Sequence, residues 1–141
     1  MKKVFPLLAV FSLLLVACPP IPHHFAYKKI EYNAYTRGSS EYISLDRSVI
    51  KYVQNNQDTI RKPIRNKHNK HLYELLKNIN LETLSGLKVP SKKHQYDGAM
   101  AATLSVYSFG DYKNTSPTFD DNNPPEELKE LIDYIKGLVK K

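Results

Sequence analysis

The chain has 141 residues, of which 41% are hydrophobic and 25% charged, and its aromatic residues are ten Tyr and five Phe, without a Trp. This apolar content excludes an intrinsically disordered chain, and the length suits one domain with a modest core rather than two. The formal net charge of +7 favours contact with anionic surfaces, while the single cysteine excludes an intramolecular disulfide and a cysteine-based metal site.

The amino-terminal segment has the layout of a signal peptide. Lys2 and Lys3 form a short positive region, and residues 4–17 are apolar apart from Pro6 and Ser12. An apolar stretch of this length matches the hydrophobic region of a signal peptide and is too short to span the core of a bilayer. The sequence therefore predicts that the protein is exported.

The apolar stretch ends in Leu15-Val16-Ala17-Cys18, which resembles the lipobox of bacterial lipoproteins. The resemblance implies that the thiol of Cys18 receives a diacylglyceryl group and that cleavage before it removes residues 1–17 as the signal peptide. An ordinary signal peptide is the alternative, but bulky Leu15 stands where ordinary cleavage needs a small residue. We expect stable membrane anchoring by two or three acyl chains, since one chain holds only marginally. Because Pro19 rather than Asp follows the cysteine, the resemblance also implies transport to the outer membrane, if the cell has one.

Residues 18–25 are expected to form a lipidated, proline-rich tether. The segment Pro19-Pro20-Ile21-Pro22 favours an extended polyproline II conformation, which would lift the following domain off the bilayer. The pair His23-His24 could bind a metal ion, but adjacent histidines in a tether are more often solvated, and we expect no metal site there. Residues 26–141 are predicted to form a single α+β domain.

The first part of this domain shows the alternation of antiparallel strands. Residues 28–35 place Lys29 and Glu31 on one face and three less polar side chains on the other, namely Ile30, Tyr32 and Ala34. A turn at 36–40 leads to a strand at 41–46, and a further strand at 48–53 follows a turn at Asp46-Arg47. The polar run Asn55-Asn56-Gln57-Asp58 ends the pattern.

Residues 51–71 are the most basic tract of the chain. Its cations outnumber a single acid, Asp58, and they are Lys51, Arg61, Lys62, Arg65, Lys67 and Lys70. A solvated loop and helix start is the favoured interpretation, and attraction to anionic lipid or cell-wall polymer is the alternative. Nucleic-acid binding is disfavoured because an exported lipoprotein does not normally meet nucleic acid. A metal site at His68 and His71 is also disfavoured, because no carboxylate or cysteine is close in sequence.

The middle of the domain is predicted to be helical and then irregular. Four apolar residues at helical spacing predict a helix over 69–80, namely Leu72, Leu75, Leu76 and Ile79. A short turn with three further leucines stops at Gly86, a polar loop covers 89–93, and Asp97-Gly98 marks another turn.

Residues 99–108 give the clearest strand pattern. The predicted buried face carries Met100, Ala102, Leu104 and Val106, and the wet face carries Thr103, Ser105 and Tyr107. A hairpin turn at 109–111 is expected to lead into a strand at 112–119, whose Pro117 indicates the edge of the sheet.

The last predicted element is an amphipathic helix that packs on the sheet. Asn123 is expected to be its N-cap, with Pro124 at the first helical position and Glu126 in a capping box. The apolar stripe comprises Leu128, Leu131, Ile132, Ile135, Leu138 and Val139. The preceding run Asp120-Asp121-Asn122-Asn123 has calcium-ligand residue types, but it lacks the alternation and the glycine of an EF-hand loop, so the start of a helix explains it better.

The order of elements resembles emfourin-type proteins, small inhibitors of thermolysin-like metalloproteases, and envelope lipoproteins of similar layout. The resemblance spans residues 28–139 and rests on short motifs: a strand pair around Arg37-Gly38, Leu87-Lys88-Val89-Pro90, Asp97-Gly98, and Asn123-Pro124-Pro125-Glu126-Glu127-Leu128 before the final helix. The chain departs from that family at Ser39-Ser40, where emfourins favour a glycine-rich, aromatic turn. The resemblance therefore implies a fold and transfers no inhibitory residue.

The sequence as a whole predicts an α+β domain with an antiparallel sheet of four or five strands and two main helices packed on one face. No nucleophile, zinc, phosphate-loop or dinucleotide motif is present, so we expect a non-catalytic protein without cofactor, nucleic acid or small-molecule substrate. The favoured function is a membrane-anchored binding module of the cell envelope that engages a protein, for which a protease is a candidate. The alternative is a structural envelope component that binds anionic polymer or lipid through the basic tract.

Overall fold

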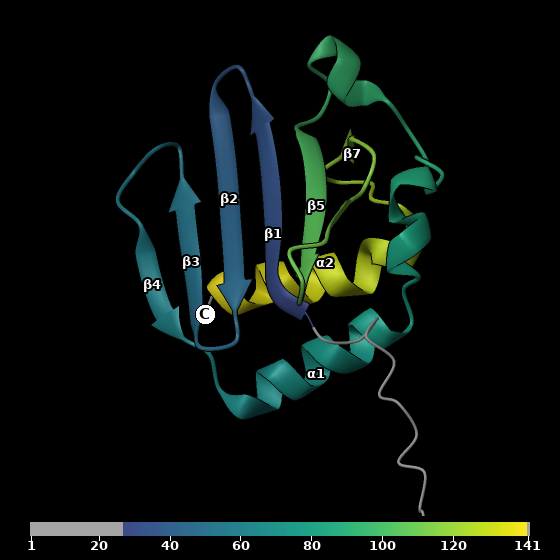
Figure 1. The fold of residues 1–141 in the computed structure, drawn as a ribbon. Coiled ribbons are helices and arrows are strands. Elements are labelled where there is room, and N and C mark those ends of the chain that lie inside the picture. Colours follow the sequence, from purple (N-terminus) through teal and green to yellow (C-terminus); the bar gives the residue numbers. More distant parts are fainter. Residues whose placement is uncertain (1–26, 141) are drawn as a thin grey trace, which may run out of the picture.

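An antiparallel sheet with helices along one face makes up the fold in the computed structural model, which describes residues 27–140 (Figure 1). The elements in chain order are β1 (Tyr27–Thr36), β2 (Ser39–Asp46), β3 (Val49–Gln54), β4 (Ile60–Pro63), α1 (Asn66–Lys77), η2 (Leu81–Gly86), η3 (Lys93–Tyr96), β5 (Ala101–Ser108), β6 (Lys113–Thr115), β7 (Phe119–Asp120) and α2 (Glu126–Val139). The predicted signal peptide 1–17, the lipidation site Cys18 and the tether 18–25 lie outside the described residues.

The strands follow the order β4-β3-β2-β1-β5-β6, and β7 pairs with β5 beside β6. The first four strands form a meander of consecutive antiparallel neighbours, so that β1 is central and β4 lies at one edge (Figure 1). The chain then crosses through α1, η2 and η3 and returns as β5 on the free side of β1. The long β1–β5 pairing thus joins two segments that are far apart in sequence.

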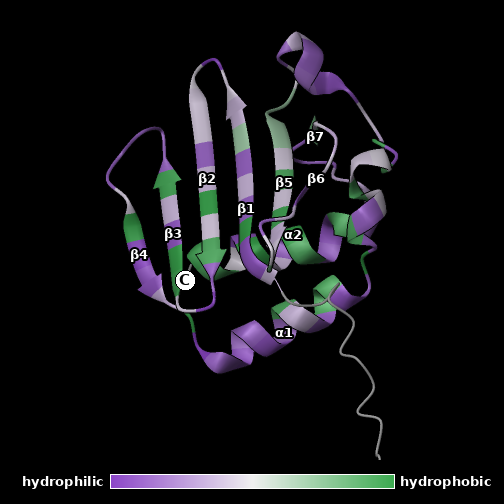
Figure 2. Cartoon of the chain, in the orientation of Figure 1, coloured by the Kyte–Doolittle hydropathy of each residue, from purple (hydrophilic) through white to green (hydrophobic). Residues whose placement is uncertain are grey.

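The core lies between the sheet and the two α-helices. Alternate strand residues point toward the helices and are fully buried, including Ile30, Tyr32, Ile43, Leu45 and Leu104. They share one cluster with the apolar stripes of the helices, namely Leu72, Leu75 and Leu76 of α1 and Leu128, Leu131, Ile132 and Ile135 of α2. Figure 2 shows this pattern as alternating hydrophobic and hydrophilic bands along the strands. The α+β class, the antiparallel sheet and the two main helices are therefore confirmed.

Within residues 27–140 the sheet has seven strands, not four or five. Strand β4 was missed because Ile60–Pro63 carries two cations and a proline, and its one aliphatic side chain, that of Ile60, is 50% exposed, so the segment shows no alternation. Such residues are typical of an edge strand. The expected strand at 112–119 is two short strands. Between them, Ser116 turns inward, where its hydroxyl accepts the Leu104 N–H at 3.0 Å.

The helix boundaries also differ from the predicted ones. Helix α1 begins three residues earlier than expected and ends at Lys77. Helix α2 begins at Glu126, and Pro125 is its N-cap, without a side-chain hydrogen bond. Asn123 does not cap this helix because its amide donates to Ser91 Oγ at 2.9 Å instead. Within the expected irregular region, Lys93–Tyr96 forms a 3₁₀ turn.

Candidate functional site

The sheet face opposite the helices holds polar and aromatic side chains in a regular array. We call it the open face, because no helix of the described residues lies over it (Figure 1). Its side chains come from six adjacent strands, and the main ones are Lys29, Glu31, Tyr42, Lys51, Arg61, Ser105, Tyr107, Lys113 and Thr115. Since strands alternate, the burial of the core face fixes these residues on the outside.

Glu31 is the centre of a hydrogen-bonded group on the open face, which we call the Glu31 cluster. Tyr42 from β2 donates its hydroxyl to Glu31 Oε1 at 2.7 Å, and Tyr107 from β5 donates to Oε2 at 2.6 Å. Lys29 Nζ lies 2.8 Å from Oε1. Both tyrosines sit diagonally across the ladder from Glu31, because its direct partners are Ser44 and Ser105. Each carboxylate oxygen thus anchors one tyrosine.

The negative charge of Glu31 is balanced within the cluster by Lys29. Partial burial alone would raise the pKa of Glu31, but the hydrogen bonds from Lys29, Tyr107 and Tyr42 hold that pKa below its ordinary value. Burial and the bond to Glu31 raise the pKa of Tyr42. Lys29 Nζ also lies 4.1 Å from the centre of the Tyr107 ring, and Lys113 Nζ lies 5.4 Å from it. Two cations thus lie close to the Tyr107 ring.

The predicted basic tract is divided by the fold into parts that face different ways. Lys51 and Arg61 are in-register partners of β3 and β4 and lie on the open face. Lys62, the next residue of β4, pairs with Ile50, points to the helix side and donates to the carbonyl oxygen of Val139 at 3.5 Å. The remaining cations lie on or just before α1. The favoured interpretation of a loop and helix start was thus incomplete, because part of the tract is strand.

Asp120 is a fully buried carboxylate that organises the loop before β5. It accepts hydrogen bonds from Ser91 Oγ, from the Lys93 and His94 backbone N–H groups at 2.9 and 2.8 Å, and from His94 Nδ1 at 2.6 Å. Burial alone would raise the pKa of Asp120, but these donors hold it far below its ordinary value. The carboxylate is therefore ionised, and His94 Nδ1 carries the proton that it donates.

Ser91, His94 and Asp120 have the residue types of a hydrolytic triad, and no local sequence pattern indicates that they meet. Their connectivity is different, however, because the serine hydroxyl and the histidine both bind the carboxylate. A nucleophilic serine needs its hydroxyl on the far nitrogen of the histidine, with the carboxylate behind. Here the carboxylate lies between the two groups. The arrangement anchors a loop and does not match an activated nucleophile.

A second polar cluster lies under α2. Asp121 accepts from the buried Tyr32 hydroxyl and from Lys136 Nζ, which also lies 3.8 Å from Glu41 Oε2. Burial, then the bond to Asp121, raises the pKa of Tyr32 strongly. The consecutive acids Asp120 and Asp121 are thus directed to different partners.

His68 and His71 lie at the contact between the two helices. His68 Nδ1 is 2.7 Å from the Tyr134 hydroxyl, and the His71 ring meets the Tyr134 ring edge-on at 4.4 Å between centres. Within residues 27–140, no three His, Cys, Asp or Glu side chains form a group that could hold a metal ion. His23-His24 lies outside this range.

A cleft of about 730 Å³ lies where the end of α1, η2 and the β5–β6 turn meet. Lys77, Glu82, Phe109 and Tyr112 contribute to its lining. No helix of the described part of the chain is long and apolar enough to cross a membrane.

Comparison with known proteins gave no match. No protein-family model, curated protein or solved structure matches the chain. The lipobox and emfourin resemblances therefore stay predictions.

The alternation of the strands already indicated part of this site. It placed Lys29 and Glu31 on one face of β1 and Tyr107 on the wet face of β5. It did not bring them together, and the role of Tyr42 was missed, because the β1–β5 pairing and its register have no local signal.

Proposed function

We propose that this protein is a non-catalytic binding module of the bacterial cell envelope, held to the membrane by a lipid on Cys18, and that the open face is its recognition surface. The observation that carries the proposal is the Glu31 cluster. It fixes two tyrosines on the uncovered face of the sheet by bonds of 2.6 and 2.7 Å.

The physics of recognition supports this role for the open face. Tyrosine contributes a large, amphipathic contact area with few rotatable bonds, which is why it is common in binding surfaces. Ordering a side chain on binding costs about 0.5–1.5 kcal/mol, and a ring that is already fixed by Glu31 avoids much of that cost. The flanking cations Lys29 and Lys113 add positive charge beside the Tyr107 ring.

The amino-terminal sequence supports the location. The run Leu15-Val16-Ala17-Cys18 resembles a lipobox, and the prolines after it suit an extended linker between the lipid and the domain. With Pro19 after the cysteine, we propose the outer membrane as the destination in cells that have one.

The partner that we propose is another protein of the envelope. The emfourin-like order of elements supports a thermolysin-like protease as the first class to test. The open face suits protein contact, because its rings and hydroxyls are satisfied within the face and can accept a partner with little rearrangement.

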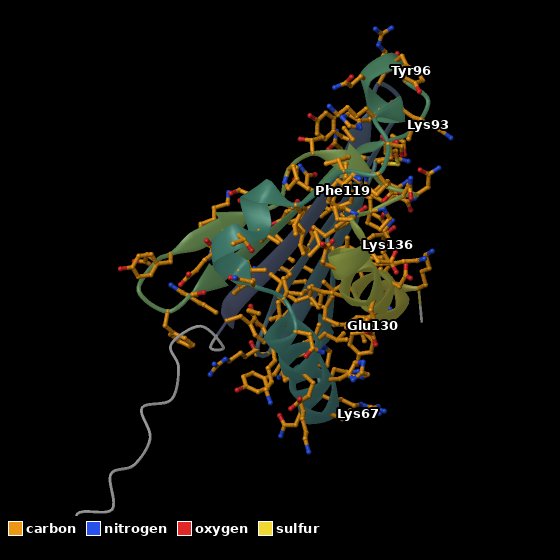
Figure 3. All side chains as sticks on the ribbon, turned by 90° about the vertical axis from the view of Figure 1, so that its right-hand side faces the viewer. Lys67, Lys93, Tyr96, Phe119, Glu130 and Lys136 are labelled. Carbon is orange, nitrogen blue, oxygen red and sulfur yellow. The ribbon has the colours of Figure 1, made fainter. Side chains whose placement is uncertain are left out.

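A photo-crosslinking experiment in the native cell tests this function. The photoreactive amino acid p-benzoylphenylalanine replaces Thr115 on the open face, which leaves both tyrosines of the Glu31 cluster in place, or, as a control, exposed Glu130 on α2 (Figure 3). We expect a discrete crosslinked protein from position 115 and none from position 130. The Tyr42→Ala change in the same chain should weaken that crosslink at least several-fold.

The contrary outcome is equally clear. Crosslinks of the same pattern from both positions, or a position-115 crosslink that Tyr42→Ala leaves unchanged, would remove the open face as the recognition surface. Saturable inhibition of a thermolysin-like protease by the purified protein, lost in the Tyr42→Ala variant, would identify the partner class.

A second candidate function is favoured by the Lys51–Arg61 pair. Like charges directly across a ladder are destabilising, so the stability of the sheet does not explain this pairing. Binding of an anionic cell-wall polymer by both cations would explain the pairing. Cosedimentation with cell-wall material should then fall with salt and in the Lys51→Glu/Arg61→Glu variant, but not in the charge-matched Lys67→Glu/Lys70→Glu variant of α1. Equal loss in both variants would show only general charge attraction.

A further inference from the structure

The β5–β6 turn exposes two aromatic side chains at the end of the sheet where the described chain begins. Phe109 is 52% exposed and Tyr112 is 72% exposed, and they are two of the five large exposed hydrophobic residues of the described range. Tyr27, the first described residue, pairs with Ser108, which directly precedes the turn. Any segment before Tyr27 therefore joins the domain beside these two rings.

The backbone of the turn holds the rings outward. Gly110 and Asp111 both have positive φ, of 88° and 61°, and the Ser108 N–H donates to the Tyr112 carbonyl at 2.9 Å. A Cβ on Gly110 would lie 3.1 Å from the Tyr112 ring, and the φ of 88° favours glycine at this position. The exposure of Tyr112 thus belongs to an ordered turn.

Cations surround these aromatic rings. The Arg47 guanidinium lies 4.7 Å from the centre of the Phe109 ring, and its Nε donates to the Tyr27 carbonyl at 3.3 Å. Lys28 Nζ lies 3.4 Å from Asp111, the one acid of the turn, and so offsets its charge. Lys113 follows Tyr112 directly, and Lys77 lies across the adjoining cleft, which also contains Glu82.

We propose that the β5–β6 turn inserts its aromatic side chains into the interface of an anionic bilayer while the chain is anchored. Aromatic rings prefer the boundary between headgroups and acyl chains, and nearby lysine and arginine are attracted to anionic lipid. The inference rests on the anchor proposed above, and it replaces the expectation that residues 18–25 hold the domain away from the bilayer. It adds that the anchored domain is oriented, with the β5–β6 turn toward the membrane and η3 away from it.

Tyr96 provides a matched control at the other end of the molecule. It lies in η3, before β5 begins, and it is also 72% exposed (Figure 3). Strand β5 spans eight residues, or about 26 Å, between the two ends. Two equally exposed tyrosines therefore differ mainly in which end of the sheet they occupy.

The experiment uses the absence of tryptophan and the single cysteine of the sequence. The chain from Cys18 onward keeps every described residue, and its thiol is coupled to a maleimide lipid in vesicles that contain phosphatidylglycerol. Tryptophan is introduced by Tyr112→Trp or Tyr96→Trp, and emission is measured with and without brominated acyl chains. We expect a blue shift and bromine quenching for Tyr112→Trp, and neither for Tyr96→Trp.

The chemical coupling separates this inference from the proposed function, because it supplies the anchor whether or not cells lipidate Cys18. Equal emission and quenching at the two positions would overturn the proposed orientation. The same signal for Tyr112→Trp in pure phosphatidylcholine vesicles would overturn the role of anionic lipid. Neither result would affect the crosslinking test of the open face.

Discussion

Asp120 shows how a single buried charge holds a long loop in place. The segment between η2 and β5 has few apolar side chains, and four hydrogen bonds to this carboxylate tie it to β7. We expect Asp120→Asn to lower the free energy of unfolding by about 2–4 kcal/mol, because an amide nitrogen would face donors in a buried site. Urea denaturation at pH 7 measures this change. The exposed Asp133→Asn substitution is the control and should have little effect.

The same residue should leave a signature in the pH dependence of stability. Its pKa is depressed in the folded protein, so the unfolded chain binds the proton more tightly between the folded value and about 3.9. Its contribution is therefore full above about pH 5 and is lost as the pH falls. Between pH 5 and pH 3, wild-type protein should lose more stability than the Asp120→Asn variant. Parallel losses would show that the charge of Asp120 does not contribute.

Local sequence patterns predicted which strand residues face outward, but they did not predict the long-range partners of Asp120. The strand period placed Glu31 and Tyr107 outward, which the structure confirms, since period and burial are local properties. Asp120 was interpreted as part of a helix start, because its partners Ser91 and His94 are 29 and 26 residues away in the chain. Contacts between residues so far apart in the chain form only in the folded protein, and no local sequence pattern indicates them.

At the scale of elements, the amphipathic helix was predicted best and the edge strands worst. The stripe of α2 repeats over four turns, so its buried face could be read directly. Strands β4 and β7 have four and two residues, too few for any period to show. The N-cap of α2 was wrong because Asn123 found a tertiary partner, Ser91, that competes with capping.

The packing of α2 on the sheet gives the next prediction. Leu131 is almost completely buried, and Leu131→Ala should destabilise the protein by about 2–5 kcal/mol, through lost burial and the cavity that remains. Neighbouring Glu130 is exposed, so Glu130→Ala should change stability by no more than about 0.5 kcal/mol. Thermal unfolding of both variants measures the difference. Similar melting temperatures would show that α2 is not part of the cooperative core.

At the scale of the whole molecule, the positions of three features define how the anchored domain would be oriented on the membrane. The chain joins the sheet beside the β5–β6 turn, the Glu31 cluster lies along the side of the sheet that the helices leave free, and η3 lies at the opposite end. A domain tethered at Tyr27 with that turn at the bilayer would stand with its strands raised from the surface. The open face would then point sideways, where a partner in the same membrane could reach it.

That arrangement depends on the lipid, which gives the last prediction. Buried acyl methylenes contribute about 0.8 kcal/mol each, so two or three chains hold a protein to a bilayer far more firmly than two exposed rings. The Cys18→Ser protein should therefore leave the membrane pellet after washing in high salt, while wild-type protein stays. The mature amino terminus of the wild type should be an acylated residue 18 by mass spectrometry. A Cys18→Ser protein that still sedimented with washed membranes would mean that something other than a thioether-linked lipid holds the domain, and the β5–β6 turn would then be the first surface to test.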